Sequence, residues 1–480
     1  MKIESLIHSL FANNPKVYNV SGDAVDYDVL VNEYRSIKNY ILTNAKEDSR
    51  VGILVNKDYY YLLTLLACME SGVAFVPMMS DYPEQRVSQL VDIASIDIMI
   101  SNTNLRQALA FDSSEVETKF ELSENRLLYI IFTSGSTGVP KGVEIIRSSY
   151  ENFLSWVSNT FDEITTEDRV LNTTEYTFDV SLMDVALLLT KNVHFFVSNF
   201  KSNIFQLCNE LEKNKITAIA TVPNNFSLMA MFKRVDLSAL KYAFIAGSRF
   251  PLSLYKDFAQ NLPDVRVFNC YGPTEFTIYC LFKEMKIEDE DVFDGCVSIG
   301  SPLTGLGALV VDEQMNSVQD GQKGELVVTG PQLMRGYVNN KEKTDEVVVT
   351  IDGLSYYRTG DLVFKNGENY FVVGRLDDTV KISGFRVNLS DVDTYIQTLP
   401  YVANVATVTQ EVKSGESRLV AFMDLTKDLS NEEIYSDLKK ILPEFQLPKK
   451  IVKLDSLPVN NSGKIDKKRL KKMTHPNKLS

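Results

Sequence analysis

Several residue types on which enzymes often depend are scarce in this sequence. Only three histidines occur among its 480 residues, so a histidine-rich metal site or a Ser-His-Asp triad has little to work with. The five cysteines include no CxxC pair and make no even framework, which argues against a disulfide scaffold and for a reducing compartment. We therefore expect a cytoplasmic protein.

Positive charge and uninterrupted apolar runs are scarce as well. The net charge of −13 argues against broad binding to nucleic acid or to anionic membranes. The most apolar stretch, 58–78, is interrupted at 70–72 and closed by Pro77, a pattern that predicts a helix, a turn and a buried strand in place of a membrane span. The N-terminal segment is amphipathic without the architecture of a signal peptide, and the sequence contains no repeat or low-complexity segment.

The arrangement of short apolar runs indicates the α/β fold class. Runs typical of buried strands alternate with stretches of helical spacing, which predicts mostly parallel sheets covered by helices. The chain exceeds the length that one core usually supports, so we expect at least two domains. The predicted strands are 51–55, 73–77, 96–100, 128–132, 216–222, 241–247 and 265–272, and the first predicted helices are 57–70 and 83–94.

The character of the sequence changes after about residue 375. Three strand patterns and one helical pattern follow, and they predict a small α+β domain. Gly374 and Asp377, in GRLDDTVKISG, suit a hinge better than a packed element. We predict a large N-terminal domain, 1–376, and a small mobile C-terminal domain, 377–480. The strand patterns lie at 381–388, 404–412 and 418–425, and the helical pattern lies at 431–442.

A loop of small and hydroxyl residues follows the predicted strand 128–132. The loop reads TSGSTGVPKG, and its glycines let backbone N–H groups approach a polyanion while Lys141 adds a positive charge. A phosphate chain is the obvious target. The loop is not a Walker motif, because Gly142 and a strand-like VEI follow Lys141 where that motif opens a helix. The predicted phosphate-binding residues are Thr133, Ser134, Gly135, Ser136, Thr137, Gly138 and Lys141.

Two turns farther along the chain carry groups that suit a nucleotide. NCYGPTE, 269–275, follows a predicted strand, and ligands of open α/β sheets usually lie at strand ends. This turn presents Tyr271 as a stacking face, Thr274 as a hydroxyl for a phosphate and Glu275 as a carboxylate for Mg²⁺. YRTGDL presents Asp361, whose carboxylate can accept both hydroxyls of a ribose.

These strings resemble the motifs of the adenylate-forming enzymes, a family that includes acyl-CoA synthetases, luciferases and the adenylation domains of nonribosomal peptide synthetases. Separated motifs occur in the family's order from about residue 20 to residue 470. One of them, GELVVTGPQLMRGY at 324–337, resembles a structural strand motif that holds a sheet. The resemblance therefore covers nearly the whole chain.

The resemblance also implies roles for single residues. NCYGPTE would bind ATP, Arg375 would contact the nucleotide, and Lys464 in NSGKID would be the catalytic lysine of adenylation. KISGFRV would carry the loop that enters the site for a second half-reaction. Besides those already named, the residues implied in nucleotide binding or catalysis are Asn269, Gly272, Arg375, Lys381, Gly384 and Lys464.

None of these motifs places a nucleophilic side chain next to a general base. The reaction that the resemblance implies needs neither group. An ionised substrate carboxylate can attack the α-phosphate of ATP if the protein aligns the two anions and neutralises their charge. Lys464 would bridge the carboxylate and the α-phosphate, Glu275 would hold Mg²⁺, and the loop 133–141 would cradle pyrophosphate. The phosphopantetheine thiol of a carrier protein would then displace AMP after the small domain rotates.

The string TFDVSLMD, 177–184, resembles the amino-acid-activating branch of the family. There the acid at the position of Asp179 pairs with the substrate's α-ammonium, which needs a carboxylate once it is desolvated. The pocket positions are uncharged, and Met183, Phe244 and Tyr279 are bulky, so we predict a small to medium apolar amino acid. By motif register the pocket consists of Val180, Met183, Thr221, Phe244, Ala246, Cys270, Ile278 and Tyr279, together with Lys464.

Other functions stay open at the level of sequence. D-alanine–carrier-protein ligases have a similar FDVSLMD string but typically a Cys where Ala246 stands. An acyl-CoA synthetase for a non-amino acid and a silent nucleotide-binding paralogue are further alternatives. The chain contains no carrier or condensation segment, so it is either a freestanding ligase that serves a carrier protein in trans or an excised domain. We expect no nucleic-acid partner and no membrane partner.

Overall fold

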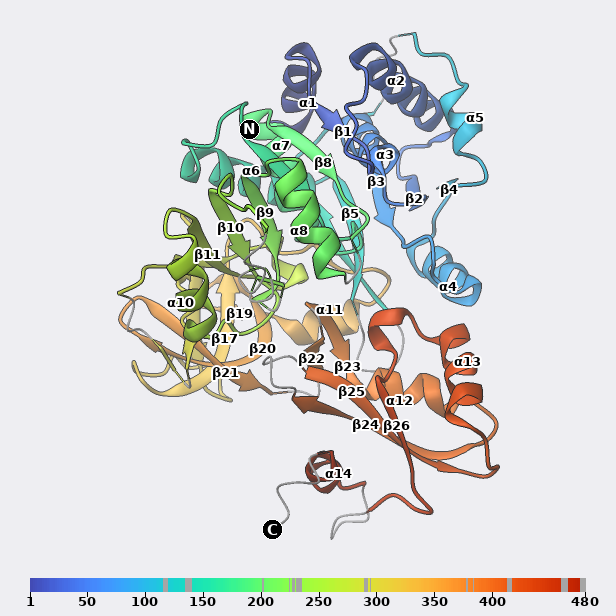
Figure 1. Cartoon of the computed structure of the whole chain (residues 1–480), viewed down its shortest axis with the longest axis vertical. Helices are drawn as coiled ribbons and strands as arrows, with labels where there is room; N and C mark the ends of the chain where they lie inside the picture. The colour runs from blue at the N-terminus through green and yellow to red at the C-terminus, as the bar shows by residue number, and fades with distance from the viewer. Residues whose placement is uncertain are drawn as a thin grey trace. The chain divides into compact units, whose positions relative to one another are not determined.

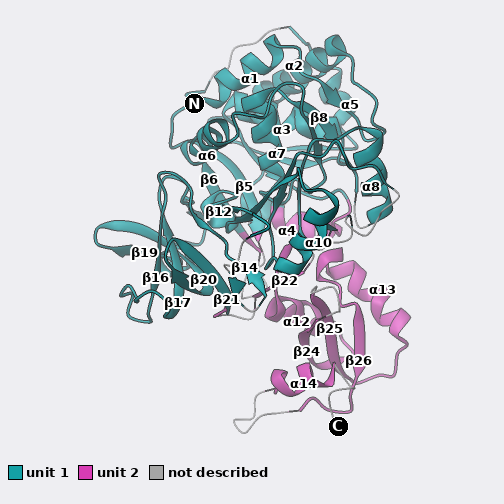
Figure 2. Ribbon diagram, turned by 60° about the vertical axis from the view of Figure 1, so that its left-hand side comes forward, with its two compact units in different colours: residues 1–80, 91–132, 142–374 teal, residues 81–90, 133–141, 375–480 magenta. Residues whose placement is uncertain are grey.

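The described chain of the computed structural model divides into two compact units, which Figure 2 colours separately. The large unit comprises Met1–Ser80, Val91–Phe132 and Gly142–Gly374, and the small unit comprises Asp81–Leu90, Thr133–Lys141 and Arg375–Ser480. The domain boundary after residue 376, and the motion predicted across it, stay predictions. The structure describes residues 1–114, 120–133, 140–200, 203–223, 225–226, 229, 235–288, 292–293, 295–376, 379–382, 384–411, 417–458 and 465–474.

The first sheet of the large unit has the strand order β1-β8-β7-β9-β10-β11-β12-β15. Figure 1 labels its strands β1, β8, β9, β10 and β11. Neighbouring strands from β1 to β11 are parallel, whereas β12 and β15 pair antiparallel at one edge. This confirms the mostly parallel sheet that the alternating pattern predicts. The strands are β1 Val17–Tyr18, β7 Arg169–Asn172, β8 His194–Val197, β9 Ala218–Thr221, β10 Tyr242–Ile245, β11 Arg266–Tyr271, β12 Leu281–Glu284 and β15 Ser301–Pro302.

The second sheet has the order β18-β6-β5-β3-β2-β4. Its strands β2, β3, β4 and β5 are parallel, and β18 pairs antiparallel with β6. Its strands are β2 Arg50–Leu54, β3 Ala74–Pro77, β4 Ile98–Ser101, β5 Leu127–Thr133, β6 Lys141–Ile146 and β18 Gly336–Tyr337. The helices along this part of the chain are α1 Ile3–Ala12, α2 Tyr27–Asn44, α3 Tyr59–Ser71, α4 Glu84–Ala94, α5 Leu105–Leu109, α6 Arg147–Thr160, α7 Ser181–Lys191, α8 Ile204–Lys213 and α10 Leu252–Asn261.

An antiparallel sheet completes the large unit; the apolar runs did not predict it, although the strand motif at 324–337 covers most of its strand β17. Its strand order is β16-β17-β20-β19, with β21 paired to β20. The long strand β20 carries Asp361 in its middle, where the sequence reading expected a turn. The strands are β16 Gly307–Val311, β17 Lys323–Thr329, β19 Val348–Ile351, β20 Leu354–Asn366 and β21 Asn369–Arg375, with α11 Lys341–Val347 before β19 and a separate pair, β13 Val292–Phe293 and β14 Cys296–Val297.

The small unit is α+β, as its sequence patterns predict. Strands β24, β25 and β26 form a sheet, and β22 pairs with β23 in a hairpin. Helix α13 begins at a capping box in which Ser430 and Glu433 satisfy each other's backbone N–H groups. The elements are β22 Thr379–Ile382, β23 Phe385–Asn388, α12 Leu389–Gln397, β24 Val402–Glu411, β25 Ser417–Leu425, α13 Asn431–Ile441, β26 Lys450–Lys453 and α14 Lys467–Met473.

The two faces of the first sheet pack in different cores. Successive strand residues point to opposite faces. Accordingly, Phe244 and Ala246 belong to the core that contains Met183 of α7, whereas Ala243 and Ile245 belong to the core formed with α8 and α10. The face toward α7 is the one that holds the predicted substrate pocket. Over the part of the chain that the structure describes, no helix is both long enough and apolar enough to cross a membrane.

Candidate functional site

The segment between β7 and α7 carries Asp179, a buried carboxyl group. Asp179 is 6% exposed, and within the described residues its Oδ2 atom has no hydrogen-bond partner. Burial raises the pKa of Asp179 from 3.8 to about 7, and the charge of Glu275 adds to that effect. Hydrogen bonding from the Ile278 N–H and the Thr274 hydroxyl opposes it. A desolvated ammonium group needs such a carboxylate as its partner.

A buried polar network lies at the two ends of the segment that carries Asp179. The Lys57 Nζ atom donates to the Asn172 carbonyl oxygen at 3.0 Å, and the Asn172 Nδ2 atom donates to Asp184 Oδ2 at 2.9 Å. Asn172 ends β7 and Asp184 lies in the first turn of α7, so the second bond joins the two ends of 173–183. Burial raises the pKa of Asp184 to about 7 and lowers that of Lys57 to about 8. The sequence reading did not single out this network, because a lysine after a strand is not a distinctive signal.

Strands β9, β10 and β11 supply a wall of the predicted pocket. Phe244 stacks on Phe268 with ring centroids 5.3 Å apart, and the register places Ala220 beside Phe244. Thr221 pairs in register with Ile245 instead, so strand alternation places it on the opposite face. Thr221 as a pocket residue stays a prediction, and the structure places Ala220 beside Phe244. The other predicted pocket residues on described elements are almost fully buried, apart from the half-buried Val180: they are Met183, Phe244, Ala246, Cys270, Ile278 and Tyr279.

The turn after β11 brings the NCYGPTE motif near the segment that carries Asp179. A Cβ atom on Gly272 would lie 2.0 Å from the Ile278 carbonyl oxygen, so only glycine fits there. The short helix η1, Thr274–Phe276, is followed by Thr277 with φ +52° and Ile278 with φ +71°. Positive φ is unusual for β-branched residues and needs support from neighbouring groups. Asp179 is close enough to this turn for the Ile278 N–H to lower its pKa.

Glu275 of η1 is a buried carboxylate that could hold a metal ion. It is 1% exposed, and its Oε1 atom accepts a hydrogen bond of 2.9 Å from the Tyr337 hydroxyl. The Met334 N–H donates to the Glu275 carbonyl oxygen at 2.9 Å, so the backbone is fixed as well. Mg²⁺ takes oxygen ligands, usually one or two carboxylates with phosphates and water. A buried carboxylate held by a neighbouring hydroxyl suits that role. The sequence reading treated Tyr337 only as part of a structural motif.

Tyr271 and Asp361 are paired in the large unit. The Tyr271 hydroxyl donates to Asp361 Oδ2 at 2.5 Å, and both residues are less than a tenth exposed. Burial, with the charge of Asp361, raises the pKa of Tyr271 well above its ordinary value, so the phenol keeps its proton. The Asn269 side chain instead donates to the Ser298 carbonyl oxygen at 2.7 Å and is 2% exposed. Asn269 therefore braces β11 in this structure.

The remaining predicted site residues fall into two groups. Those on described elements are Thr133, which ends β5, Lys141, which begins β6, Arg375, which ends β21, Lys381 of β22, and Gly384, which has φ +87° between β22 and β23. Those outside the described residues are Ser134, Gly135, Ser136, Thr137, Gly138, the hinge residue Asp377 and Lys464.

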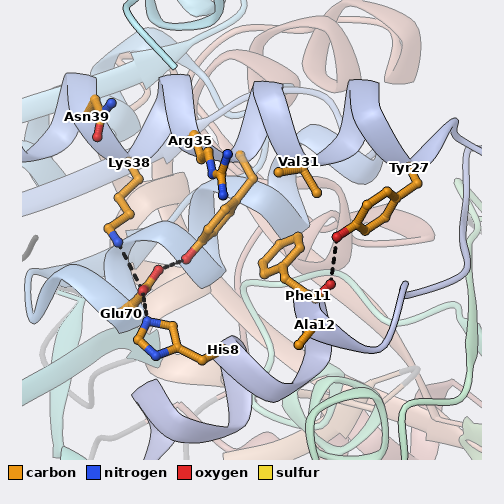
Figure 3. Close-up of a pocket in the computed structure, with 10 residues that line it drawn as sticks. His8, Phe11, Ala12, Tyr27, Val31, Arg35, Lys38, Asn39 and Glu70 are labelled. Carbon is orange, nitrogen blue, oxygen red and sulfur yellow. Dashed lines mark hydrogen bonds and ion pairs between the residues drawn. The ribbon is translucent and has the colours of Figure 1, made fainter. Parts of the chain in front are cut away.

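A separate cavity of about 310 Å³ lies between α1, α2 and the end of α3 (Figure 3). Glu70 lies at this cavity, and its carboxylate contacts Lys38 Nζ at 3.0 Å, His8 Nε2 at 2.6 Å and the Tyr34 hydroxyl. Both carboxylate oxygens are thus engaged by side chains of the protein. We assign this cavity no part in the candidate site.

The family model of AMP-binding enzymes matches residues 11–338, which is more than half of the chain. The chain belongs to the AMP-binding enzyme family. This AMP-binding enzyme is similar to bacitracin synthase 3 of Bacillus licheniformis, with 29% identity over 89% of this chain and 7% of that protein. It is also similar to the D-alanine–D-alanyl carrier protein ligase of Bacillus licheniformis, with 28% identity over 85% of this chain and 86% of that protein.

A solved structure supports the same fold. The Vibrio cholerae adenylation domain AlmE, in complex with glycyl-adenosine-5'-phosphate, matches with a TM-score of 0.84 and 22% identity over 98% of this chain and 97% of that one. The chain spans only 9%, 7% and 6% of the gramicidin and bacitracin synthases that it matches.

Proposed function

We propose that this AMP-binding enzyme activates an amino acid as aminoacyl-AMP and transfers it to the phosphopantetheine thiol of a carrier protein. The observation that carries the proposal is Asp179, a buried carboxyl group with an unpartnered oxygen among the described residues. It lies next to the turn that holds Thr274 and Glu275. This arrangement would fix the α-ammonium of the substrate close to the groups that handle ATP.

The first half-reaction needs alignment and charge neutralisation more than acid–base chemistry. A carboxylate oxygen of the amino acid forms a bond to the α-phosphorus of ATP, and the bond from that phosphorus to the bridging oxygen breaks, releasing pyrophosphate. Asp179 would hold the ammonium group so that the carboxylate faces the phosphate. Lys464 and Lys141 would neutralise the phosphate charge, and the loop 133–138 would cradle the leaving group, as the motifs imply.

The described residues suit ATP and Mg²⁺. Asp361 would bind the ribose hydroxyls, with its orientation set by Tyr271. Arg375 would contact the nucleotide from the end of β21, and Thr274 would contact a phosphate. Glu275 would hold Mg²⁺, with Tyr337 fixing the carboxylate. When bound, the metal ion neutralises charge on the phosphates.

In the second half-reaction the carrier thiolate attacks the acyl carbon, and AMP leaves with the electrons of the acyl–oxygen bond. We propose that residues 377–480 move between the two steps, withdrawing Lys464 and bringing Lys381 and Gly384 to the thiol path. Gly384 has φ +87°, a conformation that favours glycine in this hairpin. The carrier protein would act in trans, in the cytoplasm.

The substrate is proposed to be a small to medium apolar amino acid. Met183, Phe244 and Tyr279 are bulky, fully buried residues at the predicted pocket positions. A charged substrate side chain would lie unpaired among such apolar neighbours. D-alanine is the second candidate. It is favoured by the similarity to D-alanine–D-alanyl carrier protein ligases over most of both chains.

A substrate screen tests the proposal. Pyrophosphate exchange into ATP should be measured with each proteinogenic amino acid, with D-alanine and with simple fatty and aryl acids. We expect exchange to depend on an apolar amino acid. Exchange supported best by a fatty or aryl acid would place the protein with acyl-CoA synthetases, and absence of exchange with every acid would indicate a silent nucleotide-binding protein.

A further inference from the structure

Gln332, between β17 and β18, is a buried residue that nothing above assigns to the reaction. It is fully buried, and its Nε2 atom donates to the backbone carbonyl oxygens of Phe276, Thr277 and Tyr279 at 3.4, 3.1 and 2.9 Å. In return, the Thr277 hydroxyl donates to the Gln332 carbonyl oxygen at 2.7 Å. One glutamine therefore contacts the turn after η1 through both its side chain and its backbone.

These contacts surround the two residues of the turn that have positive φ. Thr277 and Ile278 both have positive φ, and each is β-branched, so this conformation is unfavourable unless surrounding contacts maintain it. The Thr277 and Tyr279 carbonyls flank Ile278, and the Gln332 amide binds both. Without the amide, buried carbonyl oxygens would lose their donor, which is costly in the interior.

The turn 275–279, which Gln332 contacts, carries residues of both the proposed ATP site and the predicted amino-acid pocket. Its N-terminal part holds Glu275, and its C-terminal part holds Ile278 and Tyr279 of the pocket wall. The Ile278 N–H lowers the pKa of Asp179 by hydrogen bonding, although burial keeps that pKa at about 7. This N–H belongs to the turn that Gln332 contacts.

We propose that Gln332 is a positioning residue that holds the turn 276–279, and with it the predicted pocket residues Ile278 and Tyr279, and so sets the affinity of the site for the amino acid. The printed contacts of Gln332 are with the turn itself, so it would act through the turn. The inference rests on the proposed function, because it concerns the same amino-acid site.

The titratable groups around Asp179 define what a pH profile would report. Glu275 of η1 raises the pKa of Asp179 by its charge. Tyr129 of β5 and Tyr279 are also near Asp179, but burial raises the pKa values of both phenols well above the ordinary value, so they stay neutral at physiological pH. Asp184 and Lys57, which lie at the two ends of the same segment, also have pKa values of about 7 and about 8. The profile between pH 6 and pH 8 therefore reports Asp179 together with these two groups, and the informative quantity is the difference between Gln332→Leu and the wild type.

The test compares Gln332→Leu with Gln314→Leu, a matched change at an exposed glutamine of the same unit. Pyrophosphate exchange of the full chain is measured with the preferred amino acid between pH 5.5 and 8.5. We expect Gln332→Leu to raise the KM for the amino acid about tenfold and to leave the KM for ATP within about twofold, because Gln332 holds the turn that carries Ile278 and Tyr279. The pH midpoint of kcat/KM should move upward, because Asp179 loses hydrogen bonding. Gln314→Leu should change none of these.

A purely structural role would lower the active fraction and hence kcat, with both KM values and the pH midpoint unchanged, and that result would overturn the inference. If Gln332→Leu does not fold, Thr277→Val decides, because it removes the 2.7 Å bond to the Gln332 carbonyl and should shift the same two quantities in the same direction. Wild-type protein without amino-acid-dependent exchange would overturn the proposed function as well. An active wild type with unchanged variants would overturn only the role of Gln332.

Discussion

The titration of Asp179 gives the most direct test of the amino-acid site. Only the ionised carboxylate can pair with an ammonium group, and burial raises the pKa of Asp179 to about 7 in the free protein. The profile of kcat/KM against pH reports groups of the free enzyme. We therefore expect kcat/KM for the amino acid to fall about tenfold for each pH unit below that pKa. The corresponding des-amino acid has no ammonium group, so its profile should lack this fall.

Ionisation of Asp179, which favours activity, should lower the stability of the folded protein. An acid whose pKa is raised by folding destabilises the folded state as pH rises from its unfolded pKa through its folded pKa, here from about 4 to about 7. The full cost, on the order of a few kcal/mol, is present above that range. Asp179→Asn removes the buried charge. Its Tm relative to that of the wild type should therefore increase between pH 4 and pH 8 in the protein without substrate.

Activity should respond in the other direction. Leaving a desolvated ammonium without its carboxylate costs roughly 3–5 kcal/mol, a hundredfold or more in kcat/KM. Pyrophosphate exchange is measured for Asp179→Asn and wild type with valine, leucine, both enantiomers of alanine, and isovalerate. A variant that gains thermal stability at pH 8 but loses only amino-acid activation would support the assignment. A variant with full activity on the amino acid, or a wild type that prefers isovalerate, would refute it.

Three further substitutions test other parts of the proposal. Lys464→Ala should abolish pyrophosphate exchange but spare thiol transfer from prepared aminoacyl-adenylate; equal loss of both reactions would contradict a role confined to adenylation. Gly384→Leu should spare exchange and block transfer to the carrier, measured by carrier acylation, and transfer at the wild-type rate would show that the loop is wrongly assigned. Tyr337→Phe removes a hydrogen bond to Glu275 and should raise the Mg²⁺ concentration for half-maximal exchange by about five- to tenfold, whereas an unchanged Mg²⁺ requirement would separate Glu275 from the metal.

The sequence predicted the elements that short-range patterns determine. Short apolar runs and helical spacing predicted the strands and helices of the parallel sheets, because a strand covered on both faces, such as β2 with residues 51–53 buried, presents consecutive residues without charge. The antiparallel sheet was missed because its strands include exposed positions and charged residues, which do not form such runs. Asp361 illustrates the difference, since its motif reads as a turn although it lies within β20.

Single residues of the site depended on contacts that sequence spacing does not encode. Motif register proposed Asp179, Phe244 and Thr221 as pocket residues, whereas the pairing that puts Ala220 beside Phe244 comes only from the structure. A shift of one residue in a strand moves a side chain to the opposite face. Gln332 was overlooked because its partners lie more than fifty positions earlier in the chain, a separation at which sequence gives no local signal.

The close packing of Gly272 against the Ile278 carbonyl has a consequence for redesigning substrate range. A larger side chain at Ile278 or Tyr279 would press on a backbone that has no free space on the Gly272 side, and any displacement would reach the residues proposed to handle ATP. Met183 and Phe244 lie instead on a helix and in the middle of a strand, where regular hydrogen bonding fixes the backbone independently of the side chain. An engineered enzyme that accepts a new amino acid without losing turnover should therefore be sought among variants at Met183 and Phe244.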